Sequence, residues 1–190
     1  MGTPPRKTIK VVGIGDAGCL AAARVMAERL DRIDVIAVNT HQTGLDAFGV
    51  DVRLLIGGGH GAGGNPELGR MAAEASAAAI RRAMTDARHV FVLCGLGGGT
   101  GSGGAPVVAR LAHERGAEVT AVVSRPFSFE GAPRQQLADA AVEALRTDAN
   151  ALSVVAGDDL MSLVHRRLSL DESMRLLTSA LAWKVLARLV

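Results

Sequence analysis

A glycine-rich segment between two regular patterns most constrains the fold of this chain. Residues 96–103 read Leu-Gly-Gly-Gly-Thr-Gly-Ser-Gly, after the apolar run 89–94 and before the Ala- and Val-rich stretch 105–112. This order predicts a strand, a glycine loop and the start of a helix. Glycines let a ligand approach the backbone closely, and the N–H groups of the loop and of the helix N-terminus attract an anion. A chain of phosphates is the expected ligand.

The loop differs from the Walker type of phosphate loop, because no lysine follows its last glycine. Thr100 and Ser102 add hydroxyl donors to it. Some other group must therefore neutralise the phosphate charge.

Short β-branched runs alternate with longer segments rich in Ala, Leu and Arg. Such alternation is typical of a parallel sheet covered by helices on both faces. We therefore expect an α/β fold with a doubly wound, Rossmann-like, mainly parallel sheet that ends in a long core helix. The expected strands are 8–14, 34–39, 89–94, 118–124 and 152–156, and the expected helices are 18–30, 66–85, 100–115, 133–148 and 158–165.

The length of 190 residues and the apolar content of 48% fit one well-buried core better than two. We expect a single domain over 1–190, with 1–7 disordered. Between 40 and 65 the pattern shows a long loop that contains a glycine cluster at 57–64. Loops of this length are usually functional or disordered.

Composition argues against several classes of partner. The net charge is +2 with scattered basic residues, and aromatic residues make up only 3% of the chain, so we expect no nucleic acid partner. The polar N-terminus and the short first apolar run fit neither a signal peptide nor a membrane span, and no broad basic face favours membrane docking. Two isolated cysteines, Cys19 and Cys94, indicate small buried residues in a reducing compartment. We expect a cytoplasmic protein.

The last segment, 170–190, is predicted to be the final core helix. Leu177, Leu181 and Val185 belong to one apolar stripe, while Trp183 lies on a second stripe nearly opposite. A helix that is apolar on two sides needs two neighbours. The sheet is one neighbour. The other side is either an exposed face, as in a helix cut from a longer protein or one tolerated as it is, or a contact surface. A contact surface would bind a partner subunit of the same type or a second copy of this chain, through Leu177, Leu181, Trp183 and Val185.

Several further loops are expected at the same edge of the sheet. In a doubly wound sheet, ligands bind in the crevice at the carboxyl ends of the strands. Residues 13–18 read Gly-Ile-Gly-Asp-Ala-Gly, directly after the first strand, which also fits an NAD-type Rossmann domain. That alternative expects an acidic residue after the second strand, where Asn39 stands.

The order of these motifs resembles the tubulin/FtsZ family over almost the whole chain. Residues 97–103, Gly-Gly-Gly-Thr-Gly-Ser-Gly, match the tubulin signature. The Asn-Pro-Glu at 65–67 and the Arg-Pro-Phe-Ser-Phe-Glu-Gly at 125–131 resemble FtsZ rather than eukaryotic tubulin. The resemblance implies a domain that binds GTP or GDP, with Mg²⁺ at the phosphates, and that assembles head to tail in cell division.

The resemblance also implies a set of ligand-binding residues. Glycine loops would surround the phosphates, Glu130 would hold the ribose, and Arg134 would lie nearby as the cation that the loop lacks. The positions that match are Gly15, Asp16, Ala17, Gly18, Asn39, Ala62, Gly63, Gly64, Asn65, Gly97, Gly98, Gly99, Thr100, Gly101, Ser102, Pro126, Glu130, Arg134, Met174 and Thr178.

The chain departs from the family pattern in three places. His41 stands where the family is usually acidic, and Ala-Gly-Asp stands at 156–158 in place of Pro-Asn-Asp. Met174 and Thr178 occupy the positions that usually bring an aromatic residue and an Asn or Asp to guanine, and Thr cannot accept two N–H donors as a carboxylate does. Guanine preference is therefore weakened.

The catalytic residues are not identified by the sequence. The acidic loop that reaches the nucleotide of the next subunit in the family lies beyond the segment seen here, so we expect slow or partner-dependent hydrolysis. A non-catalytic cap or regulator of FtsZ-type filaments is the alternative. The histidines at 41, 60, 89, 113 and 165 are dispersed without the spacing of metal ligands, and no protein metal site is expected.

Overall fold

The computed structural model describes residues 8–31, 33–163 and 168–189. The expected disorder at 1–7 lies outside the described residues. In chain order the elements are β1 (Ile9–Ile14), α1 (Gly15–Ala27), β2 (Ile33–Asn39), α2 (Gln42–Asp46), β3 (Val52–Leu55), α3 (Pro66–Ala75), α4 (Ala77–Ala83), β4 (His89–Gly95), α5 (Gly99–His113), β5 (Glu118–Arg125), the short 3₁₀ helix η1 (Ser128–Glu130), α6 (Ala132–Asp148), β6 (Ala151–Ala156), α7 (Gly157–Ser162) and α8 (Leu170–Leu189).

The six strands form one sheet in the order β3-β2-β1-β4-β5-β6, and every neighbouring pair is parallel. This is the doubly wound arrangement predicted from the alternating pattern. The strand order reverses between β1 and β4, and the crevice outside their carboxyl ends is the expected binding position in such sheets. The fold class is confirmed.

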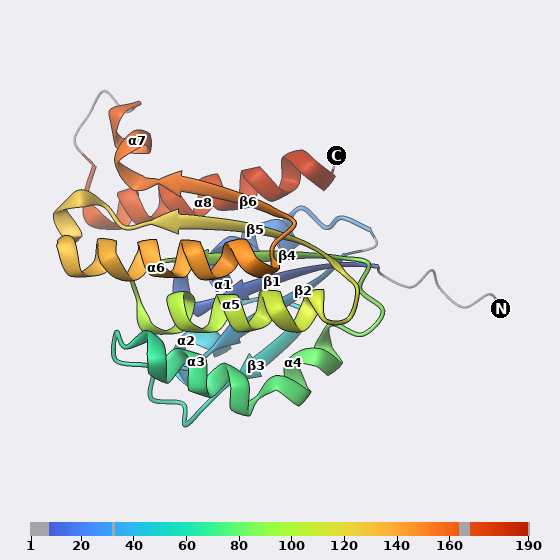
Figure 1. Ribbon diagram of the computed structural model, residues 1–190. Helices are drawn as coiled ribbons and strands as arrows, with labels where there is room; N and C mark the ends of the chain where they lie inside the picture. Colours follow the sequence, from blue (N-terminus) through green and yellow to red (C-terminus); the bar gives the residue numbers. More distant parts are fainter. Residues whose placement is uncertain (1–7, 32, 164–167, 190) are drawn as a thin grey trace.

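Helices cover both faces of the sheet (Figure 1). Successive residues of β1 face opposite sides of the sheet and belong to two different cores. Val11 packs with α1 and α8, whereas Val12 packs with α3 to α6. The central strands are buried on both faces, which explains their nearly continuous apolar sequences. The carboxyl ends of these strands are therefore held rigidly at one rim.

Glycines bring two helix backbones into direct contact beside that rim. A Cβ atom on Gly103 of α5 would lie 1.9 Å from the carbonyl oxygen of Pro66, and one on Gly69 of α3 would lie 2.2 Å from that of Gly99. No side chain fits in such spaces, so α3 can pack this closely only on a glycine-rich α5. The glycines of 97–103 thus serve packing as well as the loop.

The prediction of one long loop over 40–65 is wrong, because the segment contains α2 and β3. β3 is a short edge strand, and its residues alternate between half-buried and exposed positions. It joins the sheet through pairing with β2, a long-range interaction that a four-residue pattern beside a glycine cluster does not indicate. α2 contains Gly44 and has no side-chain cap, so it lacks the usual helix signals.

The expected helix over 66–85 is divided at Ser76, where α3 ends and α4 begins. Ser76 has φ −98° and ψ 9°, and no glycine or proline marks the break in the sequence. Pro66 follows the cap Asn65, whose side chain accepts a hydrogen bond from the N–H of Glu67. α7 covers Gly157–Ser162; the rest of the helix expected at 158–165 includes residues outside the described ranges.

Helix α8 packs one of its two apolar stripes against the sheet. Leu177, Leu181 and Val185 are 3%, 0% and 0% exposed, whereas Trp183 is 71% exposed. The prediction that all four side chains contact a partner is therefore wrong for the first three, because they fill the core of this chain. Only Trp183 of that set is available at the surface.

Both cysteines are free and buried, as the sequence predicted. Burial raises the pKa of Cys19 from 9.0 to about 12, and it raises the pKa of Cys94 as well. None of the helices in the described parts of the chain is both long and apolar enough to span a bilayer.

Candidate nucleotide-binding site

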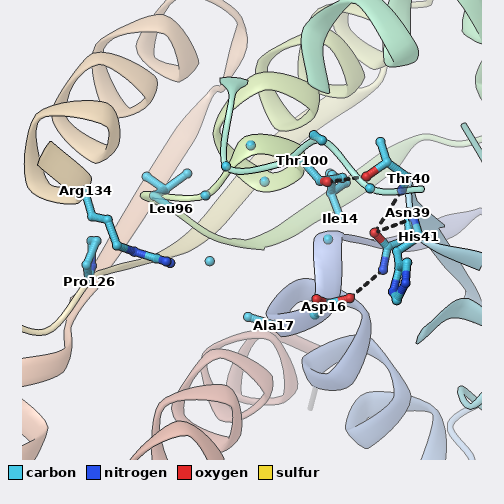
Figure 2. Close-up of a pocket in the computed structure, with 18 of the residues that line it drawn as sticks. Ile14, Asp16, Ala17, Asn39, Thr40, His41, Leu96, Thr100, Pro126 and Arg134 are labelled. Carbon is cyan, nitrogen blue, oxygen red and sulfur yellow. Dashed lines mark hydrogen bonds between the residues drawn. The ribbon is translucent and has the colours of Figure 1, made fainter. Parts of the chain in front are cut away.

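A cavity of about 440 Å³ opens at the carboxyl ends of β1, β2, β4 and β5 (Figure 2). Two helices, α1 and α5, begin at this cavity, directly after β1 and β4. Their N-terminal N–H groups lack partners within the helix and carry the positive end of the helix dipole. Both features favour an anion in this cavity.

One wall of the cavity is formed by Gly95, Leu96 and residues 98–101. Gly97 has φ +92°, and the Oγ of Ser102 accepts a hydrogen bond from its N–H at 2.8 Å. A Cβ on Gly97 would also lie 2.4 Å from Cγ of Pro126. Both the conformation and the space require glycine there. Gly97 and Ser102 hold the loop in shape, and Gly98 to Gly101 face the cavity.

The loops after β1 and β2 are joined by polar side chains. The side-chain amide of Asn39 donates to Oδ1 of Asp16 at 2.7 Å, and Oδ1 of Asn39 accepts from the N–H of Thr40 at 2.8 Å (Figure 2). Thr40 and Thr100 share a hydrogen bond between their hydroxyl oxygens at 2.6 Å. These contacts connect three loops at one end of the cavity.

Glu130 and Arg134 lie at the opposite end. Oε1 of Glu130 accepts from the N–H of Phe127 at 2.8 Å, and Oε2 lies 3.1 Å from Nε of Arg134. Pro126 and the Arg134 side chain lie side by side in Figure 2, on the far side of the cavity from Asn39. A carboxylate and a cation are thus available at this end of the cavity.

Helix α8 closes the cavity with Met174 and Leu177. Thr178 is 1% exposed, and its hydroxyl donates to the carbonyl oxygen of Met174 at 2.9 Å. The resemblance to the family implies that Thr178 lies at the base, but its hydroxyl donates to the backbone of its own helix instead. Leu177 occupies the wall beside Met174 instead.

The structure brings most of the predicted residues together. Those that line the cavity are Gly15, Asp16, Ala17, Asn39, Ala62, Gly63, Gly64, Gly98, Gly99, Thr100, Gly101, Pro126, Glu130, Arg134 and Met174. Gly18, Asn65, Gly97, Ser102 and Thr178 lie outside the lining.

The residues outside the lining support it. A Cβ on Gly18 would lie 2.2 Å from the carbonyl oxygen of Leu93, so this glycine allows α1 to pack on β4. Asn65 caps α3, while Gly97 and Ser102 fix the loop. Helix-opening glycines serve both packing and ligand approach, and the sequence alone does not separate the two roles.

Sequence reasoning missed two histidines in the lining. His41 and His60 both border the cavity. His41 directly follows Thr40, so its place in the motif was a signal for its position. His60 stands in the glycine cluster, and nothing in the sequence places it opposite His41.

Comparisons with known proteins agree with this geometry. The family model "Tubulin/FtsZ family, GTPase domain" matches residues 8–165. A structure of the FtsZ dimer of M. jannaschii, described as empty, is 37% identical with a TM-score of 0.90, over 94% of this chain and 53% of that one.

CetZ2 from Haloferax volcanii, solved as a GTPγS-bound protofilament, is 30% identical with a TM-score of 0.84, over 94% of this chain and 57% of that one. The chain thus spans about half the length of these structures. The family match, the parallel sheet and the cavity at its rim agree, and the chain belongs to the tubulin/FtsZ family.

Proposed function

We propose that this chain binds GTP or GDP in the cavity, as a subunit or regulator of FtsZ-type filaments. One observation carries the proposal: the N-termini of α1 and α5 and the glycines at 98, 99 and 101 meet at a single cavity. Backbone N–H groups there can surround a chain of phosphates without a lysine. One similar protein, CetZ2 from Haloferax volcanii, is described as a GTPγS-bound protofilament.

The proposed ligand lies along the length of the cavity. Its phosphates contact the glycine loops at the end of the cavity beside Thr40 and Thr100, which we call the phosphate end. Its ribose hydroxyls donate to Glu130, which Arg134 orients, at the opposite or sugar end. The base packs against Met174, since a thioether makes favourable contacts with an aromatic ring. Thr178 does not face the cavity, so we assign guanine recognition to none of the side chains of α8.

The residues present fit Mg²⁺ when nucleotide is bound. Asp16 brings a carboxylate to the phosphate end, and Mg²⁺ typically takes one or two carboxylates together with phosphate oxygens and water. Among the described residues, no three His, Cys, Asp or Glu side chains gather to hold a metal by themselves. When bound, the cation would neutralise phosphate charge.

Hydrolysis is proposed to depend on a partner subunit. Two carboxylates line the described cavity, and both are held by hydrogen bonds: Asp16 by Asn39, and Glu130 by Phe127 and Arg134. Because neighbouring groups already hold both carboxylates, we assign neither the role of orienting the attacking water. Acidic residues from another subunit would complete the site, since catalysis requires all groups in position.

Ligand identity is tested by chromatography of the nucleotide released on denaturing the purified chain, together with calorimetric titration with GTP, GDP and ATP. We expect guanine nucleotides to bind more tightly than ATP. Equal affinity for ATP would contradict guanine preference, and the absence of binding to any of the three would refute the assignment of the site.

Partner dependence is tested by phosphate release across a range of chain concentrations, alone and with a polymerising FtsZ. We expect low release by the chain alone and a rise that is steeper than linear in total subunit concentration. Rapid release that is strictly proportional to the concentration of the isolated chain would refute the need for a partner. If FtsZ polymers shorten without added release, the chain acts as a cap.

A further inference from the structure

Two histidines that are separated in the sequence meet at one end of the cavity. His41 follows β2, and His60 lies in the glycine cluster after β3. The two residues form an isolated antiparallel bridge, and both line the cavity.

The hydrogen bonds around the bridge fix how the two residues face each other. The N–H of Gly61 donates to the carbonyl of Thr40 at 2.8 Å, and the N–H of Gln42 donates to the carbonyl of Gly59 at 3.2 Å. These bonds flank His41 and His60, which are therefore a directly opposed pair that exchanges no hydrogen bond. In such pairs the Cα atoms are about 4.5 Å apart and both side chains leave the same face. The imidazoles thus share one face of the bridge.

This bridge closes the phosphate end of the cavity. His41 is adjacent to Thr40, whose hydroxyl is 2.6 Å from that of Thr100 in the glycine loop. His60 precedes residues 61–64, which also line the cavity. A terminal phosphate extending beyond the glycine loop would lie next to the two imidazoles.

The charged groups around the cavity are divided between its two ends. Arg134 and Arg125 belong to the sugar end, and each is paired with a carboxylate, Glu130 and Asp139 respectively. At the phosphate end, no lysine or arginine is found among the described residues that line the cavity.

Asp16 is a charged side chain close to His41. A Cβ on Gly44 would lie 3.1 Å from Oδ1 of Asp16 and 3.6 Å from Nδ1 of His41, so both groups face the same space beside α2. The Asp16 carboxylate repels phosphate, and Asn39 already donates to it. The imidazoles are the ring N–H donors that can offset this repulsion.

We propose that His41 and His60 together recognise the terminal phosphate and favour a nucleoside triphosphate over a diphosphate. Each imidazole donates an N–H to an oxygen of the third phosphate, which a diphosphate lacks. The inference rests on the proposed function, because it requires a nucleotide in this cavity with its phosphates on the glycine loops.

The test compares the affinities for GDP and for a GTP analogue with a non-hydrolysable β,γ linkage, measured by calorimetry in His41→Ala, His60→Ala and the double variant. Hydrogen bonds to charged groups predict that the double variant loses about tenfold or more in triphosphate affinity. Its GDP affinity should stay within about twofold of the wild-type value. His41→Gln and His60→Gln, which retain an N–H donor, should recover part of the loss.

His113→Ala is the matched control, because His113 is exposed at the end of α5, away from the cavity. Circular dichroism confirms that each variant is folded, and titrations with Mg²⁺ or with EDTA separate direct contact from a metal-mediated one. Equal losses for both nucleotides, or a triphosphate-specific loss that disappears in EDTA, would overturn the inference. A wild-type chain that binds neither nucleotide would refute the proposed function as well.

Discussion

The substitution Gly98→Ala is expected to weaken phosphate binding at the glycine loop without lowering the stability of the fold. Gly98 caps α5 with φ −106° and ψ 176°, an extended conformation that alanine adopts, and a Cβ there would meet no atom within 4 Å. The added methyl group would therefore cost the fold little, within about 0.5 kcal/mol. It would instead project from a residue that lines the cavity, and so keep a phosphate away from the loop.

The expected loss follows from the contact that the displaced phosphate gives up. One hydrogen bond between an N–H and a charged oxygen contributes roughly 1.5–3 kcal/mol, so GDP affinity should fall about tenfold to a hundredfold. Calorimetric titration measures the affinity, and thermal unfolding of the ligand-free chain measures stability.

Two glycines provide matched controls for this variant. Gly49→Ala also places a Cβ in open space at a residue without positive φ, but outside the cavity, so it should change neither quantity. Gly101→Ala places a Cβ 2.2 Å from the carbonyl oxygen of Gly95 and should destabilise the fold. If Gly98→Ala binds GDP as tightly as the wild type, the phosphates do not lie on this loop and the reasoning fails.

Three further predictions concern packing and ionisation. Leu181→Ala should lower the free energy of unfolding by about 2–5 kcal/mol in a denaturant titration, because the side chain is fully buried, and a smaller loss would contradict its place in the core. Trp183→Glu, on the exposed side of the same helix, should leave that free energy within about 0.5 kcal/mol; a change in sedimentation coefficient would show that Trp183 contacts another molecule. Cys19 and Cys94 should not react with a thiol reagent until the chain unfolds. Their thiols have raised pKa values in the fold and ionise first in the unfolded chain, so stability should be complete below pH 9 and should decrease as pH rises toward 12; a pH-independent midpoint would argue against this burial.

Several features of the fold followed from local patterns alone. The β-branched runs at 89–94 and 118–124 predicted β4 and β5 within a residue, because central parallel strands are apolar on both faces. Pro66 marked the start of α3 because proline fits the first turn of a helix. The break at Ser76 and the strand β3 were missed, since both depend on packing with elements elsewhere in the chain.

The candidate site was also predicted only in part from the sequence. Residues 98–101 and Asp16 could be placed at the cavity from their motifs, because a loop between a parallel strand and the next helix lies at the carboxyl edge of the sheet. The side chain of Thr178 could not be placed, because a helical register does not show whether a hydroxyl faces a cavity or its own backbone.

The sequence by itself determined the parallel α/β class, the glycine loops that follow the strands and the family. These depend on short-range patterns: periodicity, turn residues and the order of motifs. Tertiary structure alone decided which stripe of α8 is buried, which glycines pack helices together, and that His41 meets His60. These features depend on contacts between segments that are far apart in the sequence, and a local sequence pattern does not show which distant segments meet.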